Sequence, residues 1–393
     1  MKKKILSLLF AIIAIALISS PNAWAEDVVK FGISAPFSGP TATWGTETKR
    51  ICDLIFDEIN GKGGVDIGGK KYKIEVIAYD HKYSAPEAVT TVNRLIKSDN
   101  VKHVSVILGA MVYATAPIMD KAGVMSWAIG FGKETVSPKH PRQTNSCLLP
   151  PETTMGWKLI RKNWPDLKTV AGIYYNNESG KWSQECSKVN APANGFSFIE
   201  TDLVDVGTQD FSPALLKVLK NKPDILEISG LGAGDAGSII KTARGLGHKG
   251  PVAHLGTPDV VVTMQIAGAE NCENYIVHGN VSEELPPELK SYEVIREKYL
   301  AKYGPPFNSI AWQFSHLPAG FVAALQKAGS IEPDKVVAAT EGMKFESPLG
   351  GEAQYGGEPY YGVKRQIQYK APLGVIKGGK VHNLGLIPIE YSK

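Results

Sequence analysis

The sequence predicts an α/β fold made of two doubly wound lobes, in which each parallel sheet carries helices on both faces. Short apolar runs alternate with amphipathic runs from residue 28 onward, which is the pattern of βαβ units. The chain has 393 residues, more than one domain of about 100–200 residues accommodates. A polar, proline-containing stretch at residues 137–151 separates a first series of elements from a second. Because parallel sheets bind ligands at the carboxyl ends of their strands, two facing lobes predict a cleft between them.

The first series contains a helix whose apolar residues Ile51, Leu54 and Ile55 share one face, and glycines after residue 60 end it. In order we expect a strand at 28–33, that helix at 42–60, a hairpin at 65–73, a strand at 74–79, a helix at 86–98, a strand at 104–108, a helix at 116–122 and a strand at 124–129.

The second series repeats this alternation of strands and helices and then becomes more helical. We expect helices at 155–163, 183–190, 213–220 and 236–245, strands at 170–175, 197–202, 225–229, 252–255 and 275–278, helices at 289–303, 310–328 and 333–341, and strands at 363–369 and 384–389. The last fifty residues are rich in glycine and tyrosine.

Residues 1–25 read as a cleaved signal peptide rather than as part of the fold. Three lysines precede an apolar run at residues 5–19, and Ala23-Trp24-Ala25 places small residues where a signal peptidase cleaves, before Glu26. The run is shorter than the ~20 residues of a membrane span, which disfavours the alternative of an uncleaved anchor. We therefore expect an exported, periplasmic protein.

The charge of the mature chain excludes some classes of partner. The chain has 43 basic and 39 acidic residues, and removing three lysines with residues 1–25 leaves 40 against 39. A nearly neutral surface does not attract nucleic acid, so no nucleic-acid partner is expected.

The sequence shows no metal or catalytic motif. Cys52, Cys147, Cys186 and Cys272 lack C-x-x-C spacing, and the eight histidines are dispersed, so we expect no metal, no cofactor and no catalytic residues. In an oxidising compartment the cysteines form disulfides in one of three pairings, or they remain buried free thiols.

One motif supports an alternative function. Gly232-Ala233-Gly234-Asp235-Ala236-Gly237 matches G-x-G-x-x-G after a strand, and Asp259 lies about 20 residues on, as in a dinucleotide-binding fingerprint. The competing interpretation is that these glycines let the backbone approach a solute at a helix N-terminus.

Several segments in order resemble the periplasmic leucine/isoleucine/valine-binding protein family. The matching segments are APFSGPTATWG at 35–45, EIN at 58–60, GGV at 63–65, NRLI at 93–96, API at 116–118, AGV at 122–124 and ARGLG at 243–247. The resemblance implies a type I periplasmic binding fold with three crossovers between the lobes. It places residues 26–147 and 281–345 in lobe one, and residues 148–280 and 346–393 in lobe two.

The resemblance also implies a function. Members capture a small solute by lobe closure and deliver it to the membrane permease of an ABC importer, here as a monomer without catalysis. The expected solute carries a carboxylate, as an amino acid of the branched-chain type or a related compound does. The alternatives are a ligand-sensing receptor component of the same fold and, less favoured, a dinucleotide-using enzyme.

Candidate binding residues follow from the same alignment. The carboxylate is expected at the loop 109–115, which offers Tyr113 and Thr115, and at residues 126–130, where Ala128 and Gly130 align. Gly130 replaces the usual threonine, and Ser179 replaces a loop aromatic.

An ammonium group would lie in the second lobe. The tyrosine position of relatives aligns with Gly232 or Ala233, and the acid is Asp259 or its rival Asp235. Trp44 is either a wall of the cleft or a core residue, and Tyr113 is a ligand contact or a packing residue.

Overall fold

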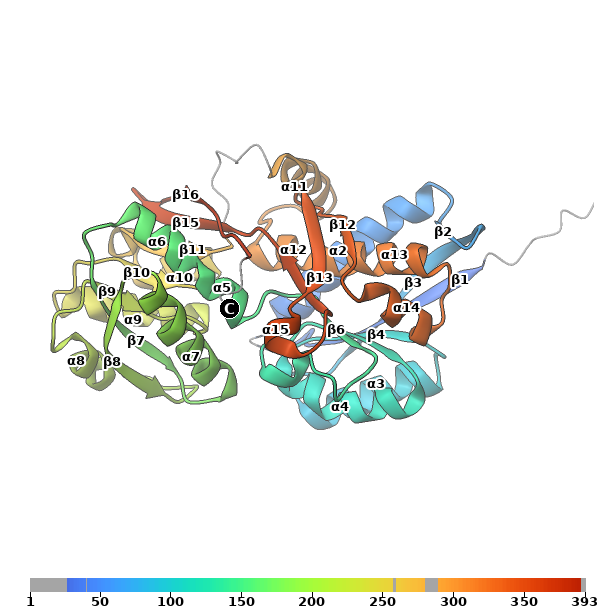
Figure 1. The fold of residues 1–393 in the computed structure, drawn as a ribbon, viewed down its shortest axis with the longest axis horizontal. Helices are drawn as coiled ribbons and strands as arrows, with labels where there is room; N and C mark the ends of the chain where they lie inside the picture. Colours follow the sequence, from blue (N-terminus) through green and yellow to red (C-terminus); the bar gives the residue numbers. More distant parts are fainter. Residues whose placement is uncertain (1–26, 40, 257–258, 280–288, 390–393) are drawn as a thin grey trace, which may run out of the picture.

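The computed structural model describes residues 27–39, 41–256, 259–279 and 289–389, which form two lobes, each around its own sheet (Figure 1). The expected signal peptide and its cleavage before Glu26 lie outside the described residues. Within them, no helix has both the length and the apolar character needed to cross a membrane.

Lobe one is built on a nine-stranded sheet of order β12-β13-β14-β6-β5-β4-β1-β3-β2. Its strands are β1 (Val28–Ala35), β2 (Val65–Ile67), β3 (Lys70–Asp80), β4 (His103–Val106), β5 (Met125–Ala128), β6 (Gln143–Asn145), β12 (Lys344–Glu346), β13 (Glu352–Gly356) and β14 (Gln366–Tyr369). Its helices are α2 (Ala42–Gly61), α3 (Ala85–Lys97), α4 (Gly109–Ala122), α11 (Lys290–Tyr303), α12 (Ser309–Phe314), α13 (His316–Ala328), α14 (Pro333–Thr340) and α15 (Glu358–Tyr361).

The core of lobe one joins distant parts of the chain. Phe321 on α13 packs against Phe31 of β1, with ring centroids 4.7 Å apart, and against Trp127 of β5 at 5.4 Å. All three side chains are fully buried. The parallel strands near the N-terminus are therefore covered by a helix that lies almost 300 residues later (321 − 31 = 290).

Lobe two is built on a seven-stranded sheet of order β16-β15-β11-β10-β9-β7-β8. Its strands are β7 (Thr169–Tyr175), β8 (Ser197–Val204), β9 (Ile225–Glu227), β10 (Val252–His254), β11 (Tyr275–His278), β15 (Pro372–Lys377) and β16 (Lys380–Leu386). Its helices are α5 (Pro150–Thr153), α6 (Trp157–Asn163), α7 (Glu178–Ala193), α8 (Ser212–Leu219), α9 (Ala233–Gly245) and α10 (Val260–Ala267).

The chain crosses between the lobes three times, and the third crossing differs from the expected one. The first two follow β6 and β11, near Cys147 and His278 as expected. The third lies between Tyr369 and Pro372, because β12, β13 and β14 extend the sheet of lobe one and Gln366 pairs with Asn145. Residues 346–369 therefore belong to lobe one, and the boundary expected after residue 345 is corrected.

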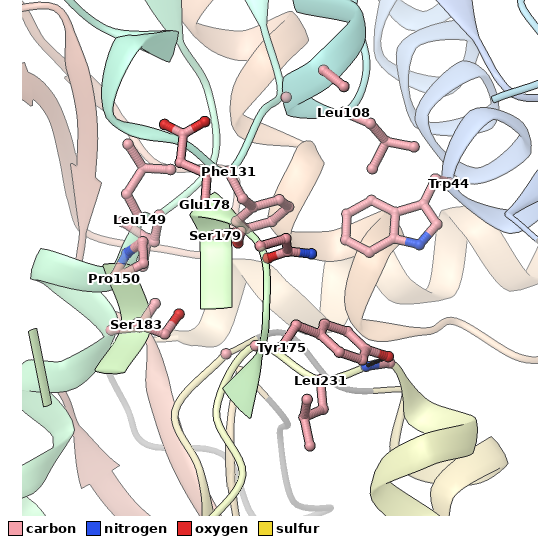
Figure 2. A pocket seen from close by; sticks show the side chains of 18 of the residues that line it. Trp44, Leu108, Phe131, Leu149, Pro150, Tyr175, Glu178, Ser179, Ser183 and Leu231 are labelled. Atoms are coloured by element: carbon pink, nitrogen blue, oxygen red, sulfur yellow. Dashed lines mark hydrogen bonds between the residues drawn. The ribbon is translucent and has the colours of Figure 1, made fainter. Parts of the chain in front are cut away.

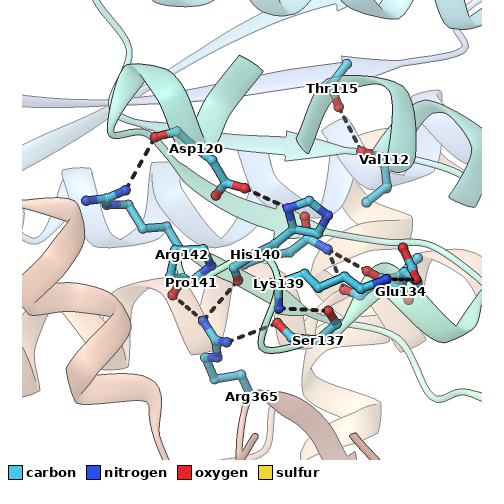
Figure 3. Close-up of polar contacts among 12 residues, drawn as sticks. Val112, Thr115, Asp120, Glu134, Ser137, Lys139, His140, Pro141, Arg142 and Arg365 are labelled. Atoms are coloured by element: carbon cyan, nitrogen blue, oxygen red, sulfur yellow. Dashed lines mark hydrogen bonds and ion pairs between the residues drawn. The ribbon is translucent and has the colours of Figure 1, made fainter. Parts of the chain in front are cut away.

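Arg365, just before β14, explains why this segment stays with lobe one. Its side chain is 3% exposed and donates hydrogen bonds to the carbonyls of Ser137 and His140, each at 3.3 Å, and to the carbonyl of Pro141 (Figure 3). A buried guanidinium that satisfies the carbonyls of the loop 137–141 fixes the segment that carries it.

A buried contact also joins the lobes beside the crossovers. Tyr361 on α15 donates to the carboxylate of Glu152 on α5, at 3.1 Å and 3.0 Å from its two oxygens. Glu152 in turn accepts from the N–H of Leu149 at 3.1 Å. The four cysteines are free and buried, which corresponds to the alternative without disulfides.

Candidate functional site

A cavity of about 390 Å³ lies between the lobes, at the carboxyl ends of their strands. Lobe one contributes Thr41, Trp44, Leu108, Ala110, Tyr113 and Phe131. Lobe two contributes Tyr175, Glu178, Ser183, Gly230, Leu231 and His254. This is the position in which a doubly wound sheet binds small molecules.

Aromatic rings form much of the cavity wall. In Figure 2 the rings of Trp44, Phe131 and Tyr175 point into one space, with Leu231 beneath them. Trp44 packs edge-on against Phe131 and at a tilt against Phe314, with ring centroids 5.7 Å apart in both pairs. Trp44 is thus both a wall of the cavity and a neighbour of the core.

Helix α4 begins at the cavity and has no side-chain cap. Its preceding residue is Leu108, whose φ of 77° is a conformation that a residue with a branched side chain rarely adopts. The N–H of Leu108 donates to the carbonyl of Ile129 at 2.6 Å, which holds this turn in place. Gly109 and Ala110 line the cavity. The first N–H groups of a helix have no partner within it, so they form a site for an anion.

Two of the lobe-two helices that reach the cavity, α7 and α9, begin beside polar side chains that already form hydrogen bonds with the backbone. Asn177 caps α7 by accepting from the N–H of Gly180 at 2.9 Å. At α9, the hydroxyl of Tyr175 accepts from the N–H of Gly232 at 3.0 Å and donates to Asp235 at 2.6 Å. The first turn of α4 is therefore the better place for a solute carboxylate.

Among the lining residues that the structure describes, Glu178 is the one with a formally charged side chain. This side chain accepts hydrogen bonds from the other lobe. Its Oε1 accepts from the hydroxyl of Tyr113 at 2.8 Å and from the N–H of Lys133 at 3.2 Å. Burial and this carboxylate raise the pKa of Tyr113, which therefore remains a protonated donor. The contact joins lobe two to lobe one at the edge of the cavity.

Three of the sequence-predicted residues line the cavity: Trp44, Tyr113 and Gly232. Gly232 begins the G-x-G-x-x-G motif, but a Cβ at this position would lie 3.1 Å from the hydroxyl of Tyr175. Tyr175 covers the helix N-terminus where a dinucleotide phosphate would bind, which disfavours the nucleotide interpretation.

Three other predicted binding residues, Thr115, Ala128 and Gly130, lie inside lobe one. The helix expected at 116–122 begins at Gly109, so Thr115 is buried on it and its hydroxyl donates to the carbonyls of Met111 at 2.8 Å and Val112 at 3.3 Å (Figure 3). Ala128 is fully buried in β5.

Gly130 is held by its own lobe. Its N–H donates to Oδ1 of Asn145 at 3.1 Å, and a Cβ there would lie 2.8 Å from Cγ2 of Thr135. A bulky residue at position 130 would therefore disturb the lobe before it touched a solute.

The two candidate acids have structural partners. Asp235 accepts from Tyr175, as described above, and Asp259 caps α10 by accepting from the N–H of Val262 at 3.2 Å. Neither residue is among those that line the cavity. The geometry therefore supports structural roles for both.

Replacing Asp259 with Ala is expected to lower the free energy of unfolding by about 1 kcal/mol, the usual contribution of a capping aspartate. Solute affinity is expected to change less than twofold, because this carboxylate is held by its own helix. Denaturant unfolding and titration calorimetry measure the two quantities, with Asp235→Asn as the comparison. A tenfold loss of affinity in Asp259→Ala would instead support an ammonium-binding role.

Sequence reasoning missed most of the lining residues, among them the rings of Tyr83, Phe131, Tyr175 and His254. Tyr175 and His254 are the last residues of β7 and β10. A polar or aromatic residue that ends a buried strand was the signal available in the sequence, because the carboxyl ends of parallel strands meet at the ligand edge.

Comparisons with known proteins agree with this architecture. A family model described as periplasmic binding protein matches residues 28–360. The leucine-, isoleucine-, valine-, threonine- and alanine-binding protein of Pseudomonas aeruginosa is 22% identical over 371 residues, which cover 88% of this chain and 90% of that protein.

Two solved structures show the same fold. A solute-binding protein of an ABC transporter from Rhodopseudomonas palustris BisB5, in complex with 3,4-dihydroxybenzoic acid, gives a TM-score of 0.75 at 21% identity, covering 94% of this chain and 99% of that one. A branched-chain amino acid transporter substrate-binding protein from Streptococcus pneumoniae, in complex with isoleucine, gives 0.73 at 20% identity, covering 91% and 98%. The fold is thus the type I periplasmic binding fold, and these proteins bind solutes rather than catalyse reactions. Because the family model covers most of the sequence, the chain belongs to the periplasmic binding protein family.

Proposed function

We propose that this chain is the solute-binding protein of an ABC importer and that it captures a small aromatic carboxylate between its lobes. The proposal includes export with cleavage before Glu26, a monomeric state, and delivery of the solute to a membrane permease. It rests on the chemistry of the cavity, taken one end at a time.

The carboxylate is assigned to lobe one. The uncapped first turn of α4 supplies N–H groups at Gly109 and Ala110. The hydroxyl of Thr41 lines the same cavity and has no hydrogen-bond partner within the described residues. Backbone N–H groups at a helix N-terminus bind a carboxylate without a cationic side chain.

The body of the solute is assigned to the aromatic walls. Trp44, Phe131 and Tyr175 surround the space, and planar rings prefer to pack edge-on or offset against such walls. This concentration of rings is the observation that carries the proposal. Among the structural neighbours, the protein from Rhodopseudomonas palustris BisB5 holds a dihydroxybenzoic acid.

A free amino acid is the second candidate, and Glu178 is the observation in its favour. A carboxylate that lines the cavity is a partner for an ammonium group. Glu178 already accepts from Tyr113 and Lys133, however, so an ammonium would have to compete with those donors. The Streptococcus pneumoniae neighbour with isoleucine shows that this fold also accommodates amino acids.

Titration calorimetry on the purified mature chain separates the two candidates. We expect benzoate or a hydroxybenzoate to bind at micromolar concentration, and leucine and isoleucine to show no binding at a hundredfold higher concentration. Benzamide is the matched control, because it keeps the ring and replaces the carboxylate with a neutral amide; it should bind at least tenfold more weakly. Binding of the amino acids without the aromatic acids would overturn the aromatic assignment.

A further inference from the structure

We propose that His254 makes the cavity selective for aromatic acids that carry a ring hydroxyl at the end remote from the carboxylate. The inference rests on the proposed function and extends it to the lobe-two end of the solute. It starts from a polar atom that the fold leaves without a partner.

His254 ends β10, is 1% exposed and lines the cavity. Its Nδ1 lies 2.8 Å from the hydroxyl of Tyr275, so this side of the ring is fixed by its own lobe. Its Nε2 is buried and has no hydrogen-bond partner within the described residues. A buried polar atom of this kind destabilises the protein unless another group reaches it.

Gly256 keeps the space beside Nε2 open, and Gly230 lies next to Gly256. A Cβ on Gly256 would lie 3.4 Å from Nε2 of His254 and 3.1 Å from the backbone N of Gly230. A Cβ on Gly230 would lie 3.0 Å from the hydroxyl oxygen of Ser183. We call Ser183, Gly230 and His254 the polar corner of lobe two; all three line the cavity.

The polar corner suits a neutral group rather than a charged one. Burial lowers the pKa of His254 to about 3, so the ring is uncharged at neutral pH and does not attract a second anion. Its neutral Nε2 is a donor or an acceptor according to whether Tyr275 donates to Nδ1 or accepts from it. A hydroxyl both donates and accepts, so it pairs with Nε2 in either tautomer.

The two ends of the cavity then define one solute. The first turn of α4 in lobe one binds the carboxylate, and the polar corner in lobe two binds the hydroxyl. The aromatic walls hold the ring between them. A benzoate without a hydroxyl leaves Nε2 unpaired, so it loses affinity relative to its hydroxylated analogue.

The test compares benzoate with 3- and 4-hydroxybenzoate by titration calorimetry, in the wild type and in two variants of His254. The wild type is expected to bind the better hydroxybenzoate at least tenfold more tightly than benzoate. In His254→Asn the amide takes the place of Nδ1 beside Tyr275 and removes Nε2, so this ratio is expected to fall below twofold. In His254→Gln the amide reaches the position of Nε2, and most of the ratio should return.

The outcomes distinguish a failure of the role of His254 from a failure of the proposed aromatic-acid function. If the wild type binds benzoate and the hydroxybenzoates equally, or if His254→Asn keeps the full ratio, the role of His254 is overturned and the aromatic-acid function stands. If the wild type binds none of these acids, both are overturned. The ratio is measured within each variant, so a general loss of stability does not imitate the expected result; thermal melting of each variant confirms that it is folded.

Discussion

Replacing Ala110 with Asp is expected to abolish solute binding, with a loss of at least a hundredfold in affinity, while the protein remains at least as stable. Ala110 is exposed at the second position of α4 and lines the cavity. An acid in the first turn of a helix interacts favourably with the helix dipole, typically by 0.3–1 kcal/mol. The same carboxylate would occupy the N–H groups assigned to the solute and would repel its anion.

The matched control is Ala110→Asn, which has nearly the same size without the charge. We expect this variant to lose much less affinity than Ala110→Asp, because it obstructs the site without repelling an anion. Calorimetry with the best aromatic acid measures binding, and thermal melting measures stability. Equal losses in the two variants would mean that bulk rather than charge is excluded there, and full affinity in Ala110→Asp would place the carboxylate elsewhere.

Stability is expected to fall steeply as the pH drops below about 6.5. His103, His278 and His316 are buried, and burial lowers the pKa of each to about 4, while that of His254 falls to about 3. In the unfolded chain these groups titrate near pH 6.5. Their native pKa values are depressed, so the unfolded state binds more protons in this window and acid favours unfolding.

Glu227 acts in the opposite direction. Burial raises its pKa to about 7, although it accepts hydrogen bonds from Tyr174, Ser187 and Ser229. Its native form holds a proton between about pH 4.5 and 7, so its contribution to stability is present at low pH and is lost as the pH rises. These four histidines against one glutamate leave about three protons taken up on unfolding, or about 4 kcal/mol per pH unit near pH 5.5. Burial also lowers the pKa of His81 and of His248, which adds to this uptake.

Urea unfolding at half-unit pH intervals from 7.5 to 4.5 measures this slope. His103→Gln removes one titrating group and should lower the slope by about a third, whatever its effect at neutral pH. A free energy of unfolding that stays constant from pH 7 to pH 5 would contradict the prediction.

The alternation of strands and helices could be predicted because buried parallel strands appear as short apolar runs between amphipathic ones. The third crossover could not be predicted, because β12, β13 and β14 are short and no pattern in their sequences indicates which sheet they join. In the folded protein, the pairing of β14 with β6 and the hydrogen bonds of Arg365 attach these strands to the sheet of lobe one.

The site was predictable where the backbone alone places a residue, as for Trp44 and Gly232. It was not predictable where capping and ligand binding call for the same residue type, as at Asp259. The unpaired Nε2 of His254 and the left-handed turn at Leu108 depend on neighbours that lie in other segments, so the local sequence carries no sign of them.

The interleaving of the lobes along the chain governs the order in which the protein can fold during synthesis. When a ribosome has released residues 1–145, Phe31 and Trp127 still lack Phe321, which arrives about 180 residues later (321 − 145 = 176). Lobe two likewise waits for β15 and β16, which lie within the last 22 residues (393 − 372 + 1 = 22). Lobe one is complete only when β14, which ends at Tyr369, has emerged, and lobe two only when β16, which ends at Leu386, has emerged, so both cores are completed late in synthesis.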